Sequence, residues 1–306
     1  MLNELRELLR KYGLKPRKHL GQNFLINKDI LSEIIKAADL NKNDTVLEIG
    51  PGLGILTKEL AKKVKKVIAI EKDEKLVKIL KKELSHLKDV EIVEGDALQL
   101  TTDDLKLHTG YSLLVTGYKL VANLPYYITS PVIRKFLEEG NPPPSTKVST
   151  FVKTSADRSG GRPKLMVLMV QKEVAERICA KPPDMSLLSV AVQFYSQAKI
   201  VKIVKKESFW PSPKVDSAII KLTTNNLPRW QAGRQLTTIN TNLFFKIVKA
   251  GFSQPRKQLK NNLKKIFGKD TEKILKQSKI ETTRRAETLS IDEWLKICLN
   301  YKNRLK

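Results

Sequence analysis

The chain contains little cysteine, little histidine and no long apolar run. Its two cysteines, Cys179 and Cys298, are far apart and form no C-x-x-C pair. This argues against a disulfide scaffold or a zinc site and favours a reducing, cytoplasmic compartment. The three histidines, His19, His86 and His108, are scattered without metal-ligand spacing. No apolar stretch approaches the roughly 20 residues that a membrane-spanning helix requires, so we expect neither a metal nor a membrane.

Acidic residues are also in short supply. The 306 residues include 57 Lys and Arg against 32 Asp and Glu, for a formal net charge of +25. A field of this sign attracts polyphosphate and makes its binding depend on salt. The excess is uneven, because residues 223–306 carry 19 basic and 6 acidic side chains, a difference of 13. The composition therefore favours a nucleic-acid partner, with about half of the excess charge in the last part of the chain.

Two groups of basic residues have different surroundings in the sequence. Many lysines of the first half, such as Lys62 and Lys63, fit simple solvated helix faces. Between Phe252 and Phe267, basic residues alternate with apolar ones at helical spacing. For these basic residues, contact with RNA phosphates is at least as good an interpretation as a solvated helix face. The basic side chains of that segment are Arg256, Lys257, Lys260, Lys264 and Lys265.

Residues 44–70 predict a strand, a glycine-rich turn, a helix and a second strand. The first strand spans 44–49, the turn 50–54, the helix 55–64 and the second strand 66–70. Glycines in such a turn let the backbone approach a ligand that lies outside the carboxyl ends of parallel strands. We therefore expect Gly50 and Gly52 to line a nucleotide-like ligand.

Two further strand ends each supply a polar side chain. Glu71 follows the strand 66–70, where a carboxylate can accept both hydroxyls of a ribose, and Asp96 follows the strand 90–94, where it can accept from an adenine amino group. A dinucleotide-binding oxidoreductase shares the glycine turn and the acid about twenty residues later. The third glycine, however, comes one residue too early for that fingerprint, and no other segment resembles a hydride-transfer site.

An Asn-Leu-Pro-Tyr string follows a short apolar run. The exocyclic amine of a purine is a poor nucleophile, because its lone pair is spread into the ring. The carboxamide oxygen of Asn123 and the carbonyl of Leu124 can each accept one of its N–H bonds and draw the nitrogen towards a tetrahedral state. Pro125 keeps the preceding carbonyl in an extended setting, and Tyr126 offers a flat face for a flipped base. Alone, the string indicates only a turn; after the three strand ends it indicates methylation of a base amino group.

These motifs resemble the small-subunit ribosomal RNA adenine dimethyltransferases nearly end to end. Besides the glycine turn and the Asn123 string, the matching segments are 15–25, 170–177, 209–217, 252–263 and 285–290. The resemblance implies that S-adenosylmethionine supplies methyl groups to N6 of two adjacent adenines in a hairpin loop near the 3′ end of small-subunit (16S) rRNA. It also implies that the partners are this rRNA and the immature small ribosomal subunit, and that the protein acts as a monomer.

The resemblance further assigns roles by position. Asn123 and the Leu124 carbonyl would hold the target amine, and Tyr126 and Phe209 would sandwich the base. The cofactor would be lined by Asn23, Leu25, Gly50, Gly52, Glu71, Asp96 and Asn123. No general base is required, since the methylated amine is acidic enough to lose its proton to solvent.

The expected fold is α/β, in two domains. Residues 1–222 are predicted to form a Rossmann-like methyltransferase sheet flanked by helices, with a flexible insertion at 141–164, and residues 223–306 a small, all-helical, basic RNA-binding domain. An amphipathic helix is expected to precede Gly13. Two other functions stay open: a large-subunit rRNA adenine methyltransferase of the macrolide-resistance type, and a non-catalytic RNA-binding assembly or transcription factor.

Overall fold

The structure is a computed structural model of residues 1–306, and it describes all of them except 18–20, 102–103, 106–116, 139–160, 225–239 and 305–306. Its packing divides the chain into two compact units. The first unit comprises Met1–Ala175 and Gln197–Asn226, and the second comprises Glu176–Ser196 and Leu227–Lys306. The predicted insertion at 141–164 lies outside the described residues, apart from its last few positions.

The first unit is built on a seven-stranded sheet in the order β4-β3-β2-β5-β6-β9-β7. The strands are β2 (Thr45–Ile49), β3 (Lys66–Glu71), β4 (Val90–Glu94), β5 (Lys119–Asn123), β6 (Leu165–Gln171), β7 (Ser196–Val204) and β9 (Ser217–Thr224). From β4 to β6 every neighbouring pair is parallel, whereas β9 runs antiparallel to β6. The predicted α/β sheet is therefore confirmed, and β2, β3 and β4 lie within one residue of the strands predicted at 44–49, 66–70 and 90–94.

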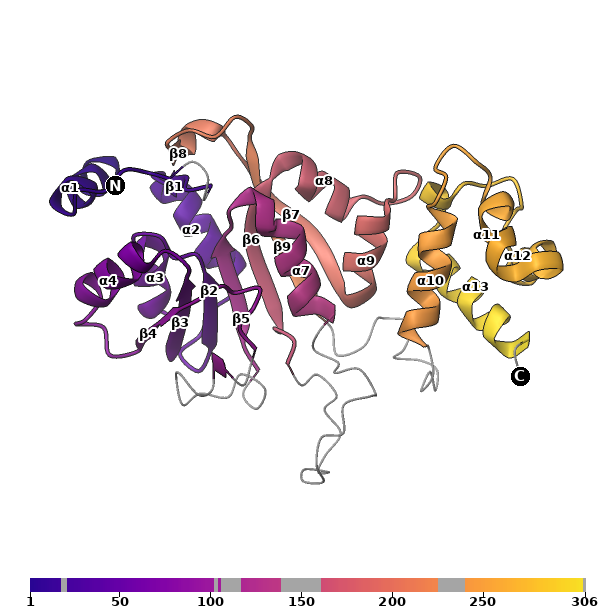
Figure 1. Ribbon diagram of the computed structural model, residues 1–306, viewed down its shortest axis with the longest axis horizontal. Helices are drawn as coiled ribbons and strands as arrows, with labels where there is room; N and C mark the ends of the chain where they lie inside the picture. Colours follow the sequence, from indigo (N-terminus) through magenta and orange to yellow (C-terminus); the bar gives the residue numbers. More distant parts are fainter. Residues whose placement is uncertain (18–20, 102–103, 106–116, 139–160, 225–239, 305–306) are drawn as a thin grey trace, which may run out of the picture. The chain divides into compact units, whose positions relative to one another are not determined.

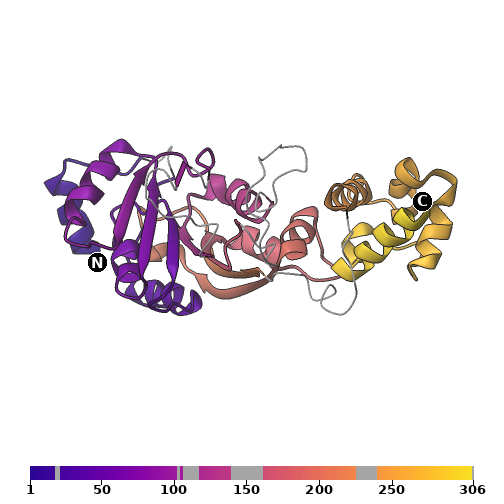
Figure 2. The ribbon, with the colours of Figure 1, turned by 90° about the horizontal axis from the view of Figure 1, so that it is seen from below.

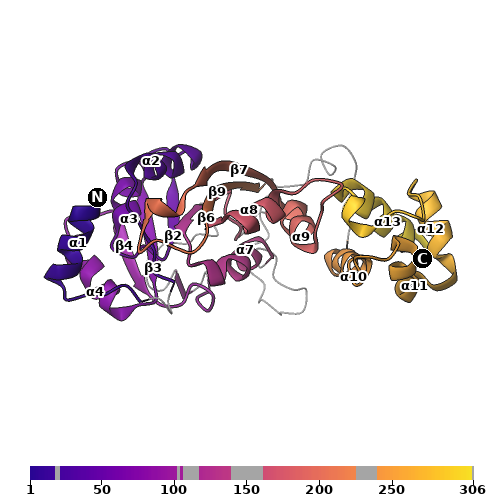
Figure 3. The ribbon, with the colours of Figure 1, turned by 90° about the horizontal axis from the view of Figure 1, so that it is seen from above.

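Helices cover both faces of this sheet. On one face lie α2 (Lys28–Ala37) and α3 (Ile55–Ala61), and on the other lies α7 (Thr129–Glu138) (Figures 1 and 3). Figure 2 shows the same layers from the opposite side. The apolar positions of α2 and α3 recur at helical spacing and pack on alternate residues of the strands, including Val46, Val67 and Val121. This burial fixes the carboxyl ends of the parallel strands at one edge.

The amino-terminal helix α1 (Leu2–Lys11) docks on the helix α4 (Glu74–Glu83). Leu5 and Leu9 on one side of α1 are buried, as its amphipathic pattern predicts. At its end, Lys11 and Tyr12 both donate to the Glu83 carboxylate, at 2.7 and 2.5 Å.

A second, two-stranded sheet joins segments that are far apart in the sequence. Strand β1 (Phe24–Leu25) pairs antiparallel with β8 (Phe209–Trp210), so that Phe24 lies opposite Trp210 and Leu25 opposite Phe209. The sequence did not predict this pairing, because two-residue strands have no detectable periodicity. It brings the segments 15–25 and 209–217 together at the edge where the parallel strands end.

The second unit is helical. It consists of α9 (Leu187–Tyr195), α10 (Thr241–Gly251), α11 (Leu259–Phe267), α12 (Thr271–Gln277) and α13 (Ile291–Arg304), and α8 (Lys172–Cys179) leads into it. The rings of Phe194 and Phe244 stack with centroids 4.4 Å apart. Because of such contacts, Glu176–Ser196 packs with the second unit, although the predicted boundary at 222/223 assigned it to the first.

Candidate active site

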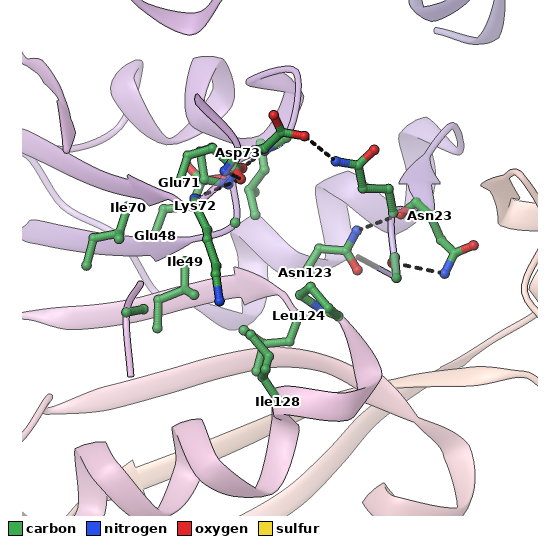
Figure 4. Close-up of a pocket in the computed structure, with 18 of the residues that line it drawn as sticks. Asn23, Glu48, Ile49, Ile70, Glu71, Lys72, Asp73, Asn123, Leu124 and Ile128 are labelled. Atoms are coloured by element: carbon green, nitrogen blue, oxygen red, sulfur yellow. Dashed lines mark hydrogen bonds between the residues drawn. The ribbon is translucent and has the colours of Figure 1, made fainter. Parts of the chain in front are cut away.

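A cavity of about 380 Å³ opens at the carboxyl ends of the parallel strands (Figure 4). It lies wholly within the first unit. Its volume falls within the range of roughly 300–1,000 Å³ that is common for small-molecule sites. The structure brings all the predicted site residues to its lining: Asn23, Leu25, Gly50, Gly52, Glu71, Asp96, Asn123, Leu124, Tyr126 and Phe209.

The Glu71 carboxylate is fixed by backbone donors. One oxygen accepts from the N–H groups of Lys72 and Asp73, both at 2.9 Å, and the other accepts from the Gly52 N–H at 3.2 Å. Gly52 has φ +63°, and a Cβ there would lie 3.2 Å from the Phe24 ring, so the turn requires glycine. Burial raises the pKa of Glu71, and these three hydrogen bonds oppose the rise. The carboxylate is thereby held still at the end of β3 while facing the cavity.

Asp96 lies at the end of the neighbouring strand and is paired. Its Oδ2 is 2.9 Å from Lys72 Nζ, and its Oδ1 accepts from the Leu98 N–H at 2.9 Å. Burial acts to raise the pKa of Asp96, but the Lys72 ammonium and the Leu98 N–H outweigh it, so the pKa lies below its ordinary value. Asp96 is therefore an ionised acceptor on the cavity wall.

Asn123 ends β5, and its carboxamide has a defined orientation. Its Nδ2 donates to the backbone carbonyl of Asn23 at 3.3 Å, and Asn23 in turn donates from its own amide to the Gly21 carbonyl (Figure 4). A carbonyl can only accept, so the nitrogen end of Asn123 must face Asn23. The oxygen end is left as the acceptor at the opposite side of the amide.

The aromatic residues predicted to hold a base have different surroundings. Tyr126 opens a 3-10 turn (Tyr126–Ile128) directly after Pro125, and its hydroxyl lies 2.6 Å from Ser217 Oγ. Phe209 belongs to β8 and is only 3% exposed. Both residues line the same cavity, as their proposed common function requires.

Some lining residues were not predicted. Glu48 is a strand residue of β2 that is 1% exposed, and its Oε2 has no hydrogen-bond partner among the described residues. Burial raises the pKa of Glu48 to about 8; the nearby Thr57 hydroxyl opposes this rise, and the Glu71 carboxylate adds a smaller contribution to it. Glu48 is thus mostly in its neutral form at pH 7. The signal was present in the sequence, as an acid inside an otherwise apolar strand before the glycine turn.

Asp73 holds the amino-terminal segment that contains Arg17 and Gln22 against the cavity, and these contacts are called the clasp. This carboxylate forms an ion pair with Arg17 at 3.2 Å and accepts from the Gln22 side chain at 3.2 Å. It also caps α4 by accepting from the Lys75 N–H. An acid two residues after Glu71 was the available signal, but its partners lie some fifty positions earlier. The clasp explains why Asn23 reaches Asn123.

Among the described residues, no group of three or more His, Cys, Asp or Glu is arranged to hold a metal ion. In the same part of the chain, no helix is both long and apolar enough to cross a membrane.

Comparison with known proteins establishes the family of the chain. The family model for ribosomal RNA adenine dimethylase matches residues 13–303. The chain belongs to the ribosomal RNA adenine dimethylase family. It is 40% identical over 304 residues to the ribosomal RNA small subunit methyltransferase A of Dehalococcoides mccartyi, covering 98% of this chain and 94% of that one. Its identity to the protein of the same name from Clostridioides difficile is 41% over 300 residues, with 95% and 93% covered.

Solved structures show the same fold. A dimethyladenosine transferase from Plasmodium falciparum superposes with a TM-score of 0.69 at 27% identity, covering 92% of this chain and 98% of that one. The 23S rRNA methyltransferase ErmE gives the same TM-score at 23% identity, covering 92% of this chain and 100% of that one. The Rossmann-like methyltransferase fold, the family and the class of enzyme are therefore confirmed, whereas the roles assigned to single residues stay predictions.

Proposed function

We propose that this ribosomal RNA adenine dimethylase transfers methyl groups from S-adenosylmethionine to N6 of two adjacent adenines in the 3′-terminal hairpin loop of small-subunit rRNA. The observation that carries the proposal is the fixed carboxamide of Asn123. Its nitrogen is committed to the Asn23 carbonyl, which leaves its oxygen to accept an N–H bond from an amine.

The polar groups of the cavity fit those of the cofactor. Glu71 presents a carboxylate that the turn holds in place, suited to two ribose hydroxyls, and Asp96 presents an ionised acceptor suited to an adenine amino group. Glu48, which also lines the cavity, adds a buried carboxyl oxygen with no partner among the described residues. The remaining proposed contacts are Asn23, Leu25, Gly50 and Gly52. When bound, S-adenosylmethionine supplies an electrophilic methyl group on a sulfonium.

The protein acts on the acceptor by holding it and reshaping its amine. The Asn123 oxygen and the Leu124 carbonyl accept the two N–H bonds of N6 and favour a tetrahedral nitrogen with its lone pair directed forward. Tyr126 and Phe209 stack on the two faces of the flipped adenine. Alignment of this kind contributes on the order of 7–11 kcal/mol to lowering the barrier. The extra proton on the methylated nitrogen leaves to water, so that no residue of the cavity has to act as a base.

The partners follow from this substrate. We propose that the immature small ribosomal subunit is the physiological target, that the reaction takes place in the cytoplasm without a metal, and that the enzyme acts as a monomer. Several basic residues of the second unit, including Arg256 and Lys257, are exposed and suit contacts with RNA phosphates.

The nearest rival is methylation of large-subunit rRNA. The likeness to ErmE extends to the fold, whereas the relatives at about 40% identity are named for the small subunit. Methyl transfer from radiolabelled cofactor to immature small subunits and to free large-subunit rRNA, followed by mapping of the modified positions, tests the proposal. We expect dimethylated adjacent adenines in the small subunit alone. Label confined to one large-subunit adenine would establish the rival function, and failure to bind cofactor would favour a non-catalytic assembly factor.

A further inference from the structure

The hydroxyl of Tyr126 is engaged by a residue that has no assigned role. Tyr126 Oη and Ser217 Oγ are 2.6 Å apart, a short distance for two neutral hydroxyls. Ser217 is fully buried, and burial raises the pKa of Tyr126, so the ring is held by a neutral hydrogen bond at neutral pH.

Ser217 reaches this edge because of strand direction. It is the first residue of β9, which runs antiparallel to β6 and pairs Ser217 with Gln171 at the end of that strand. An antiparallel strand begins where its parallel neighbours end. The start of β9 is therefore delivered to the edge at which β5 delivers Asn123.

The position of Ser217 is held from the residue before it. The Asp216 carbonyl accepts from the Lys172 N–H at 3.0 Å, and its carboxylate accepts from the Lys206 N–H at 3.1 Å and lies 3.2 Å from Lys205 Nζ. These contacts tie the start of β9 to two other segments of the sheet edge. Ser217 consequently has little freedom to follow a moving tyrosine.

Tyr126 is thus fixed at both ends. Its backbone follows Pro125 and is closed into a turn by the hydrogen bond from the Ile128 N–H to the Pro125 carbonyl at 3.1 Å. The second side-chain torsion of a tyrosine is otherwise broad. A bond at the far end of the ring removes that freedom and sets the plane of the ring in the cavity wall.

We propose that Ser217 is a positioning residue for methyl transfer, holding the Tyr126 ring in the plane on which the target adenine stacks. This inference rests on the proposed function, because it presupposes a base in the cavity. It gives the Asp-Ser pair at the end of the segment 209–217 a definite purpose: Asp216 fixes the strand start, and Ser217 fixes the ring.

The test is a double-mutant cycle on steady-state methylation of small-subunit RNA. Tyr126→Phe and Ser217→Ala remove the same bond from opposite ends, and each should lower kcat roughly 3- to 10-fold, since one neutral hydrogen bond is at stake. The kcat of the double variant should be no lower than that of the less active single variant, because the same hydrogen bond is lost only once. The KM for the cofactor should stay unchanged, and Ser217→Thr, which keeps a hydroxyl, should recover most of kcat.

A fluorescence measurement and a control variant separate positioning from folding. An RNA hairpin with 2-aminopurine in place of the target adenine should be quenched by stacking in the wild type and brighter in Ser217→Ala. Ser212→Ala is the matched control, because in the described part of the chain its exposed hydroxyl donates to the backbone carbonyls of Lys206 and Pro213; its kcat and quenching should equal those of the wild type.

Losses of the two single variants that multiply in the double variant would overturn the inference. So would equal quenching in Ser217→Ala and the wild type, or a loss of kcat matched by an equal loss of cofactor affinity and a lower Tm. A wild-type protein that binds cofactor but methylates no adenine would instead contradict the proposed function, and the two failures are therefore distinguishable.

Discussion

At the residue scale, Asn123 has the most restricted chemistry in the site. A carboxamide is the side chain that donates at one end and accepts at the other, and Asn123 uses its donor end on the Asn23 carbonyl. An aspartate has the same shape but would place an acceptor against that carbonyl. Shape and charge therefore contribute separately at this position.

We expect Asn123→Ala to lower kcat by roughly 100- to 1,000-fold, the range for loss of one preorganised polar group that acts as the reacting centre changes shape. RNA affinity should change far less, since the bond matters most in the transition state. Asn123→Asp should be similarly inactive. Turnover and RNA Kd measured on the same preparations decide the matter, and equal losses in both quantities would contradict the assigned role.

Glu48 should make the stability of the protein depend on pH. Its pKa is about 8 when folded, against an ordinary value of 4.5. Between these values the folded chain holds one proton more than the unfolded chain, so the free energy of unfolding decreases as the pH rises through this window and levels off above it. The effect is on the order of 1.4 kcal/mol for each pKa unit.

Glu48→Gln should remove this contribution. Relative to wild type, the variant should gain stability progressively from pH 5 to pH 8, as measured by urea unfolding. Glu94→Gln, at an exposed position on β4 of the same sheet, is the control and should show no such trend. A difference between Glu48→Gln and wild type that stays constant over this range would refute the pKa assignment.

At the scale of elements, the sequence predicted what periodicity can encode. The strands β2, β3 and β4 were recognisable in the sequence, and Glu71 and Asp96, predicted at the ends of β3 and β4, both line the cavity. The pairing of β1 with β8 and the clasp between Arg17 and Asp73 were not predicted, because they depend on contacts between distant segments. The partner of Tyr126 was missed for the same reason.

The helices α10 and α13 make a close approach that only glycine permits. A Cβ on Gly251 would lie 2.3 Å from an atom of the fully buried Trp294 ring. We expect Gly251→Ala to destabilise the second unit by about 1–3 kcal/mol or more through overpacking. Thermal and urea unfolding measure this, with the exposed Lys249→Ala on the same helix as control. Equal stability of the two variants would show that the ring can shift freely.

At the scale of the whole molecule, charge and packing follow different boundaries. Basic residues gather after position 223, yet the second unit also includes Glu176–Ser196. The alternation of strands and helices in the sequence did not indicate that Glu176–Ser196 belongs to the second unit. Complementary shape decides whether Val190 and Phe194 pack on the sheet or on α10, and a sequence pattern does not show it. The pattern at 252–267 was likewise only partly helical, since α11 begins at Leu259 and leaves Arg256 and Lys257 on an exposed turn.

The salt dependence of RNA binding should report on that turn and on α11. Replacing both Lys257 and Lys260 with Ala should weaken RNA binding and reduce the slope of log K against log salt by about 1.5, if each contacts one phosphate. Replacing Lys62 and Lys63, which removes the same charge from a helix end in the first unit, is the control. An identical slope in both double variants would exclude Lys257 and Lys260 from the RNA footprint.

The pairing of β1 with β8 also determines when, during synthesis, the active site can be completed. During synthesis the amino-terminal segment emerges first, but the wall that contains Phe209 and the start of β9 emerges only after some two hundred further residues. A nascent or prematurely terminated chain can therefore hold the glycine turn and Glu71 while lacking the surface on which a base is stacked. Fragments of this protein that end before β9 should be catalytically silent even where they bind the methyl donor.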